Sequence, residues 1–433
     1  MKVENEQRIL HSKKKAGVSS ILYVAFCSFY ISGLSSELHN YIQVGLYLAW
    51  LFVAMLEDRY AFKYSIQNKS NYLLLLFLAF YVFTGVLSGS AWNLITYVIV
   101  FVMLYGAFIP ANYYLYRGRK KEVLFIVRTI AFVWGLFALN AILFYSVNPS
   151  AARTLAADFY AYDSIAIGGG YAIAFGSALL AVYLVDLLLN VKVKRRQKTW
   201  CIIGIVLLLY LLIKTESTTT LIACVLGIIV SFTRRFIKRH SYSGTGKFFS
   251  YALVLLLGIF IYANINTIGG MMLANTTDTD QLLTRRFNRI GEKLFYAGSS
   301  TSSENYVDER WGYVLLSFNT FAENPLLGIG YQSGYDYGIM ERSGVGMHSE
   351  IGDTLAQYGL IGSIIWFSMI IVTLKRMSDK KVGRSYIVSL LLMSLLNPFR
   401  YFHGFFILFS FIPLMNALIR KEQVYITSSN GGK

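Results

Sequence analysis

Two residues late in the chain have side chains suited to proton transfer and to holding an anion, His348 and Arg310. Imidazole accepts a proton near neutral pH, so His348 could serve as a general base. A guanidinium keeps its charge at working pH and binds paired phosphate oxygens, so Arg310 could hold an anion. The alternatives are a solvated loop histidine and an arginine paired with Asp308 and Glu309. The helices and loops around both residues distinguish these alternatives.

Six further residues could contact a charged ligand or a sugar: Arg285, Arg286, Arg289, Arg153, Arg400 and Tyr331. The first three lie on a predicted amphipathic helix over 283–294, whose basic face suits either membrane headgroups or an anionic lipid-linked ligand. The other two arginines lie in separate polar loops and could equally be solvated. The tyrosine could stack on a sugar face or pack its own loop.

The composition indicates an integral membrane protein. The chain has 433 residues, of which 55% are hydrophobic and only 15% charged, with a mean hydropathy of +0.51. A soluble protein carries about 25% charged residues. Many apolar runs approach the roughly 20 residues that cross a bilayer. We therefore predict an all-α integral membrane protein with about 12 transmembrane helices, a single polytopic domain over 1–433.

The apolar runs predict where the spans lie, and one long polar segment, 264–350, separates the ninth from the tenth. The expected spans are about 17–34, 41–56, 72–87, 94–115, 123–145, 164–189, 200–213, 219–232, 248–263, 353–374, 386–396 and 405–418. The lysines at 13–15 precede the first span without a small-residue cleavage site after it, which indicates an uncleaved signal anchor.

The distribution of basic residues predicts the orientation. With the N-terminus inside, 30 of the 40 Lys and Arg residues lie in inner segments, nine lie in outer segments and Arg128 lies within a span. Six of the nine outer ones are in the long loop, and long loops follow the positive-inside rule weakly. We therefore expect both termini in the cytoplasm and 264–350 outside. The net charge of +17 reflects topology signals and predicts no nucleic-acid binding.

The outer loop contains signals for local structure around the two candidate residues. A second helix should begin near Asp308 and end before Pro325, with an apolar stripe at Trp311, Val314, Leu315, Phe318 and Phe321. Gly328 and Gly330 permit a tight turn back toward the membrane. Ser349 can cap the helix that follows His348.

Glycines and charged residues within the predicted spans also indicate how those spans pack and where their side chains lie. Gly359 and Gly362 should let a neighbouring helix pack closely on the tenth span. Arg128 and Asp186 lie near the inner ends of their spans, which favours snorkelling of both side chains to the interface.

The spacing from His348 to Gly362 resembles a signature of the O-antigen ligase and polymerase family. That signature is His, then Asn, Ser or Gln, and later Gly-x-x-Gly; the matching residues here are His348, Ser349, Gly359 and Gly362. The run 310–330 looks like the segment that opens the family's catalytic loop. The run 215–220 resembles its Thr-x-Ser-Arg segment, although Thr218 stands where the family has Arg.

This resemblance implies a fold similar to class C glycosyltransferases and an enzyme of the bacterial cytoplasmic membrane. Its active site would face the extracytoplasmic side and bind a glycan on undecaprenyl pyrophosphate, with membrane lipids around it. A chain-length regulator and a flippase are further candidate partners. No cofactor is expected. No metal is expected either, although Asp278 and Asp280 have the spacing of a metal-binding carboxylate pair.

Three functions follow as hypotheses. In the first, the protein is a polymerase of lipid-linked repeat units, with His348 activating the acceptor hydroxyl and Arg310 binding the donor pyrophosphate with help from the basic helix. In the second, it is an O-antigen ligase that passes finished glycan to a lipid A core or a protein. In the third, it is a polytopic transporter or lipid flippase, which the absence of internal repeats and of mid-span charge disfavours.

Overall fold

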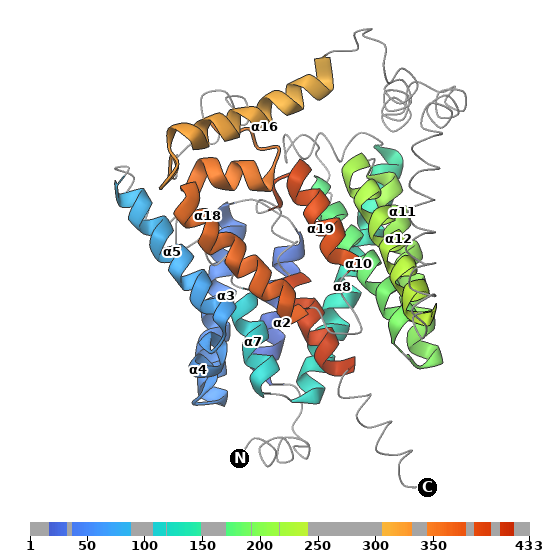
Figure 1. The fold of residues 1–433 in the computed structure, drawn as a ribbon. Helices are drawn as coiled ribbons and strands as arrows, with labels where there is room; N and C mark the ends of the chain where they lie inside the picture. The colour runs from blue at the N-terminus through green and yellow to red at the C-terminus, as the bar shows by residue number, and fades with distance from the viewer. Residues whose placement is uncertain are drawn as a thin grey trace, which may run out of the picture.

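A computed structural model describes a helical protein (Figure 1). The residues that it describes are 17–32, 37–87, 107–117, 119–148, 170–191, 193–215, 217–240, 305–330, 344–377, 385–399 and 408–419. The predicted ninth span lies outside this set.

Most of the described helices overlap predicted spans, because long apolar runs can satisfy their backbone groups in a bilayer only as helices; Ala61–Ile66 and Asn305–Glu323 lie outside them. They are α2 (Val18–Ser32), α3 (Glu37–Glu57), α4 (Ala61–Ile66), α5 (Lys69–Leu87), α7 (Phe108–Arg117), α8 (Lys120–Val147), α10 (Gly170–Asn190), α11 (Arg195–Lys214), α12 (Thr218–His240), α16 (Asn305–Glu323), α18 (Glu350–Met377) and α19 (Ser385–Leu396). A further apolar helix runs over Leu408–Ile419.

Six of the described helices are long and apolar enough to cross a membrane: Lys69–Leu87, Lys120–Val147, Ile173–Asn190, Arg195–Lys214, Thr219–Phe236 and Glu350–Arg376. Four shorter apolar helices accompany them: Val18–Ser32, Tyr41–Glu57, Ser385–Leu396 and Leu408–Ile419. The described part of the chain therefore fits a multi-pass membrane protein.

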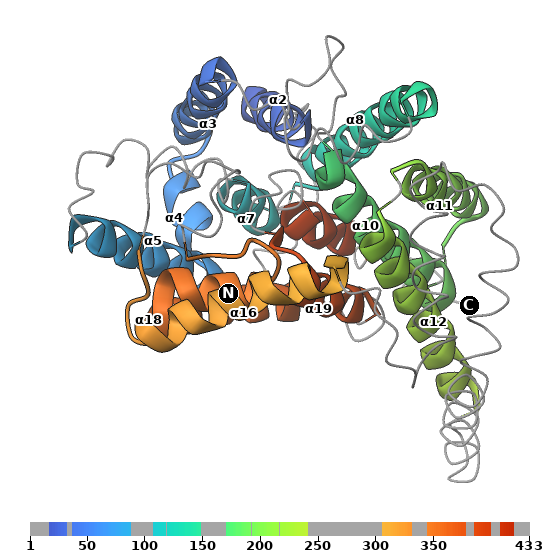
Figure 2. The same cartoon turned by 90° about the horizontal axis from the view of Figure 1, so that it is seen from above.

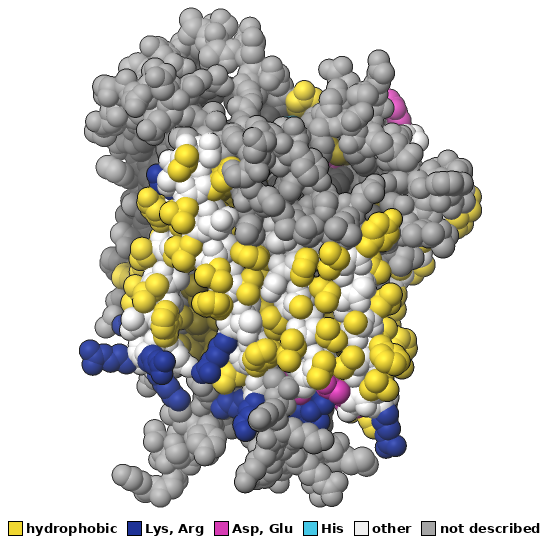
Figure 3. Space-filling model, turned by 180° about the vertical axis from the view of Figure 1, so that it is seen from behind, with side chains coloured by type: hydrophobic (Ala, Val, Ile, Leu, Met, Phe, Trp, Pro, Cys, Tyr) yellow, Lys and Arg dark blue, Asp and Glu magenta, His cyan; other side chains and the backbone are white. Residues whose placement is uncertain are grey.

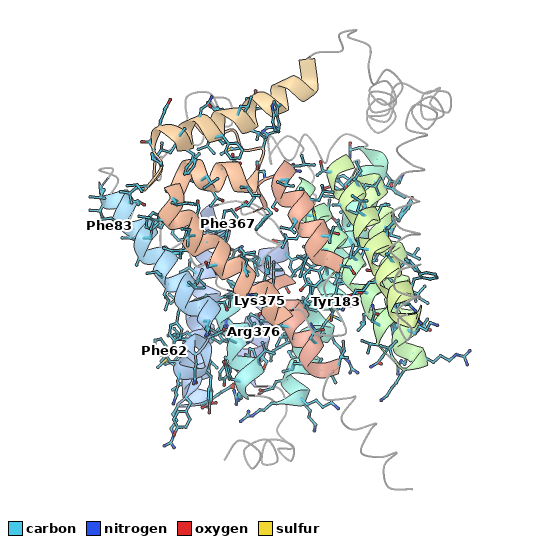
Figure 4. All side chains as sticks on the ribbon, viewed as in Figure 1. Phe62, Phe83, Tyr183, Phe367, Lys375 and Arg376 are labelled. Carbon is cyan, nitrogen blue, oxygen red and sulfur yellow. The ribbon has the colours of Figure 1, made fainter. Side chains whose placement is uncertain are left out.

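Helix α10 is the buried centre of one half of the molecule. It packs against α11, α12 and α19, and most of its residues are buried. Its Ser177 accepts a hydrogen bond from Trp134 Nε1 of α8 at 3.2 Å, and Tyr183 donates to Asn416 Oδ1 at 2.8 Å. Figure 4 places Tyr183 in this region. Polar side chains thus fix the register of α10 against its neighbours.

Basic side chains gather at one end of the molecule. Figure 3 shows most of the visible described lysines and arginines near the end opposite α16, and one near the other end. Lys375 and Arg376 end α18 on this side (Figure 4). Here the buried Arg117 lies 3.2 Å from Glu57, 3.9 Å from Asp58 and 3.8 Å from Glu122. One guanidinium therefore joins the ends of α3, α7 and α8.

The two charges expected to snorkel behave differently. Arg128 is exposed on α8, as a snorkelling residue would be. Asp186 is fully buried, so snorkelling was wrong for it. Its carboxylate lies 3.6 Å from Arg234 of α12 and accepts a hydrogen bond from Asn190 at 2.7 Å. A buried carboxylate is tolerated when such partners offset its lost hydration.

Helix α18 is broken at Gly359. This glycine has φ 59° and ψ −165°, a conformation that is essentially restricted to glycine. In Figure 1 the first part of α18 runs beside α16, and the second part turns to run along α5. The break removes the helical hydrogen bonds that would join 360 to 356 and 361 to 357.

The hairpin 325–330 replaces those lost hydrogen bonds. Leu360 N donates to Pro325 O at 2.8 Å, and Ile361 N donates to Leu326 O at 3.2 Å. In return, Ala356 O accepts from Ile329 N at 3.0 Å, and Gln357 O accepts from Gly330 N at 2.9 Å. We call these four bonds the hairpin bridge. They satisfy the freed backbone groups within protein, as a broken membrane helix requires.

The two glycines of the tenth span therefore have separate structural roles. A Cβ on Gly359 would lie 2.4 Å from the backbone carbonyl of Leu326, and one on Gly328 would lie 2.5 Å from Gly359 N. Gly359 thus admits the hairpin backbone and not a neighbouring helix, contrary to the prediction. Gly362 does admit a neighbouring helix, since its Cβ would lie 2.4 Å from Phe80 of α5.

Candidate functional site

The candidate site lies where α16 packs along the first part of α18. Figure 2 shows α16 lying along α18 at this end of the molecule. The buried side of α16 is polar: Ser317 is fully buried and Thr320 is nearly so. The apolar stripe faces outward instead, with Trp311 61%, Leu315 44% and Phe318 40% exposed. Helix α16 thus contacts α18 through the hydrogen-bonded Ser317, with Phe318 near Gly352, and leaves Trp311 and Leu315 exposed.

One carboxylate joins α16, α18 and the turn between them. Asp353 Oδ1 accepts a hydrogen bond from the Ser317 hydroxyl at 2.6 Å, and Asp353 Oδ2 accepts from Ser349 N at 3.2 Å. The same Ser317 oxygen accepts from Gly346 N at 2.8 Å. Ser349 caps α18, as predicted, because its Oγ accepts from Gly352 N at 3.2 Å.

His348 lies in this turn with its ring held on two sides. Its Nδ1 lies 2.6 Å from Gly346 O. A carbonyl oxygen can only accept, so Nδ1 carries the hydrogen and, in the neutral ring, the lone pair is on Nε2. The ring stacks on Tyr313 of α16, with centroids 4.9 Å apart and planes inclined by 25°. The ring is half-buried, and the tautomer leaves Nε2 as the basic nitrogen.

The backbone of the turn is strained and tightly packed. Met347 has φ 54°, in the left-handed region that non-glycine residues rarely adopt. A Cβ on Gly346 would lie 1.9 Å from Tyr313 O, so only glycine fits there. Strain of this kind persists where surrounding contacts over-determine the conformation, and it concentrates at functional sites.

A second buried carboxylate lies next to the turn. Glu350 is fully buried at the start of α18 and accepts from Trp366 Nε1 at 3.0 Å. The Thr354 hydroxyl lies 3.2 Å from the same carboxylate oxygen. Trp366 belongs to the second part of α18, so this contact ties the two parts of the broken helix together. Its ring also packs on Phe77 of α5, with centroids 5.1 Å apart.

The structure describes two of the predicted site residues and leaves the others outside the described set. His348 is described in full, and Arg310 is described as a backbone position on α16. Position 310 is three residues before Tyr313, so the two share a face of the helix. The other predicted ligand-binding residues lie outside the described residues: Arg153, Arg285, Arg286, Arg289, Tyr331 and Arg400.

Sequence reasoning missed several polar residues that build this site. Ser317, Tyr313 and Asp353 were not selected, because each is ordinary in its own segment. Asp353 itself could have indicated the site. It is a carboxylate in the first turns of a membrane helix, where a charged side chain is costly and usually functional. Among the described residues, no group of three or more His, Cys, Asp or Glu side chains is placed to hold a metal ion.

The geometry above falls within a recognised domain. Residues 203–367 match the family model described as O-antigen ligase. These residues belong to the O-antigen ligase family. The matched range contains α16, His348, the hairpin bridge and Gly359, so the family domain includes the whole candidate site. No curated protein matches the chain significantly.

The match of residues 203–367 to the O-antigen ligase family supports a broad activity. It implies a glycosyltransferase-type reaction of the ligase or polymerase kind, on a lipid-linked glycan, in a membrane. The six long apolar helices agree with that setting. The family match covers residues 203–367 only, and it leaves the acceptor and the glycan to be determined by experiment.

Proposed function

We propose that the protein is an extracytoplasmic glycosyltransferase that polymerises oligosaccharide repeat units carried on undecaprenyl pyrophosphate into O-antigen, capsular polysaccharide or exopolysaccharide. The observation that carries this proposal is the state of His348. It lies in the O-antigen ligase domain with Nδ1–H committed to Gly346 O, so Nε2 carries the lone pair that a general base needs.

The proposed reaction needs one base and a held leaving group. The acceptor sugar hydroxyl gives its proton to His348 Nε2, and its oxygen forms a bond to the anomeric carbon of the donor glycan. The bond from that carbon to the pyrophosphate oxygen breaks, and undecaprenyl pyrophosphate leaves with the electron pair. Cations that hold the pyrophosphate stabilise the charge developing on it. Arg310 is the first candidate for this role, with Arg285, Arg286 or Arg289.

Two features support an outer location and a lipid-linked donor. Most of the described basic residues seen in Figure 3 lie near the end opposite α16, and basic residues mark the cytoplasmic side of membrane proteins. The exposed stripe of Trp311, Leu315 and Phe318 suits contact with lipid, including the isoprenoid chain of the donor. We infer that the α16 end is extracytoplasmic and that both termini are cytoplasmic.

The test uses purified protein in vesicles with a labelled undecaprenyl-pyrophosphate-linked repeat unit. His348→Ala should lower the rate of undecaprenyl pyrophosphate release by about 100- to 10,000-fold, the range for a positioned general base. Arg310→Ala should raise KM or lower kcat. Ser363→Ala is the matched control, because Ser363 is a buried hydroxyl of α18 with no hydrogen-bond partner among the described residues. Wild-type rates in both site variants would rule out these roles.

A ligase is the second candidate, because the matching family model is described as O-antigen ligase. The same vesicles discriminate the two activities. Growth of the glycan with the lipid-linked repeat unit as sole substrate indicates a polymerase. Undecaprenyl pyrophosphate release that requires an added lipid A core or protein acceptor indicates a ligase.

A further inference from the structure

The turn that carries His348 is tied at both ends to a single carboxylate. On the C-terminal side, Ser349 N donates to Asp353 Oδ2 at 3.2 Å. On the N-terminal side, Gly346 N donates a hydrogen bond to Ser317 Oγ at 2.8 Å, and the Ser317 hydroxyl donates a hydrogen bond to Asp353 Oδ1 at 2.6 Å. The two residues that flank Met347 and His348 are therefore fixed relative to each other through Asp353.

Capping of α18 explains only the hydrogen bond from Ser349 N to Asp353 and not the one from Ser317. Ser349 already caps the helix through its side chain, and its carbonyl accepts the regular helical bond from Asp353 N at 2.9 Å. Asp353 is fully buried, and an apolar residue would avoid the cost of removing a carboxylate from water. What Asp353 adds is a connection from α18 to the turn and, through Ser317, to α16.

The turn needs such a connection because its own backbone does not favour it. A non-glycine residue in the left-handed region, such as Met347 at φ 54°, is held there by its surroundings. The carbonyl of Gly346 is also the atom that receives His348 Nδ1–H. Rotation of the 346–347 peptide would therefore break the hydrogen bond that fixes both the position of the imidazole and its tautomer.

We propose that Asp353, acting through Ser317, is the positioning residue for His348. It holds the turn so that the ring stacks on Tyr313, Nδ1–H points at Gly346 O, and Nε2 keeps the lone pair. Asp353 itself contacts neither substrate nor reacting atoms. This inference rests on the proposed function of His348 as the base.

The test measures kcat and KM for undecaprenyl pyrophosphate release in the vesicle assay. Asp353→Asn keeps the size of the side chain but offers its two donors, Ser317 and Ser349 N, only one acceptor atom. Its kcat should fall about 10- to 100-fold, as a misplaced catalytic group does, with KM within a few-fold of wild type. Ser317→Ala should lower kcat in the same way. The double variant should lose no more than the worse single variant, because both changes release the same turn.

Two controls separate positioning from general loss of structure. Asp186→Asn removes an equally buried carboxylate at the other end of the molecule and should lower stability without a selective loss of kcat. Ser363→Ala removes a buried hydroxyl of α18 and should leave kcat unchanged.

Multiplicative losses in the Asp353→Asn, Ser317→Ala double variant, or an unchanged kcat in Asp353→Asn, would overturn the inference. An inactive His348→Ala protein beside a fully active Asp353→Asn protein would refute the inference and leave the proposed function standing. A fully active His348→Ala protein would refute both.

Discussion

The break in α18 predicts a large penalty for one methyl group. Gly359→Ala places a Cβ 2.4 Å from the Leu326 carbonyl and forces alanine to adopt φ 59°, ψ −165°. Holding a non-glycine residue there costs about 1–3 kcal/mol. Relieving the contact separates the hairpin from α18, and losing two of the four hydrogen bonds of the hairpin bridge costs about 1–3 kcal/mol more. The expected loss in the free energy of unfolding is about 2–6 kcal/mol.

The assay is thermal unfolding of purified protein in detergent, followed by intrinsic fluorescence. Gly135→Ala is the matched control, because a Cβ at Gly135 in α8 would meet no atom of the described residues within 4 Å. Alanine is the better helix former, so this variant should be as stable as wild type or slightly more so. Gly328→Ala touches the same contact as Gly359→Ala, so their combined effect should be less than additive. A Gly359→Ala protein that unfolds at the temperature of the Gly135→Ala protein would refute the hairpin bridge.

Three other changes test buried polar contacts by the same unfolding measurement. Arg117→Ala should lower the free energy of unfolding by about 3–5 kcal/mol, because it leaves three carboxylates without the guanidinium between them. Arg117→Lys should lower it less. Arg234→Ala should cost about 3 kcal/mol by leaving Asp186 buried without its ion pair, and adding Asp186→Asn should recover much of that loss. Trp366→Phe keeps the packing but removes a donor from Glu350, so it should cost about 1–3 kcal/mol. A single variant as stable as wild type would show that its contact does not stabilise the fold.

The sequence predicts the described spans well, because bilayer thickness and backbone hydrogen bonding leave one solution for an apolar run of about 20 residues. For α5 the expected 72–87 compares with Lys69–Leu87, and for α8 the expected 123–145 compares with Lys120–Val147. Family resemblance on His348 and two glycines also predicted the domain that the family model matches.

The parts that sequence could not predict depend on contacts between distant segments. The break at Gly359 is stable because the hairpin 325–330 forms hydrogen bonds with the backbone groups that the break leaves unpaired. No local sequence pattern predicts that pairing. The amphipathic pattern of α16 correctly marked its apolar stripe. It could not show that the helix contacts α18 through Ser317, because hydrophobicity identifies the buried face only when the surroundings are water.

The buried carboxylates illustrate the same limit. The position of Asp186 in the chain predicts snorkelling, whereas its partner Arg234 lies on another helix. The position of Asp353 indicates only the start of a span, whereas its partner Ser317 lies 36 residues earlier on α16. In both cases the side chain acquires its role from an element that only the tertiary structure brings near.

The most direct measurement of the central claim is the rate of undecaprenyl pyrophosphate release by the His348→Ala protein. It should be made in vesicles with a labelled lipid-linked repeat unit, beside wild type and Ser363→Ala at equal amounts of folded protein. If His348 Nε2 is the base, wild type and Ser363→Ala release undecaprenyl pyrophosphate at similar rates, and His348→Ala is slower by at least about 100-fold. A His348→Ala rate equal to that of Ser363→Ala would contradict the claim.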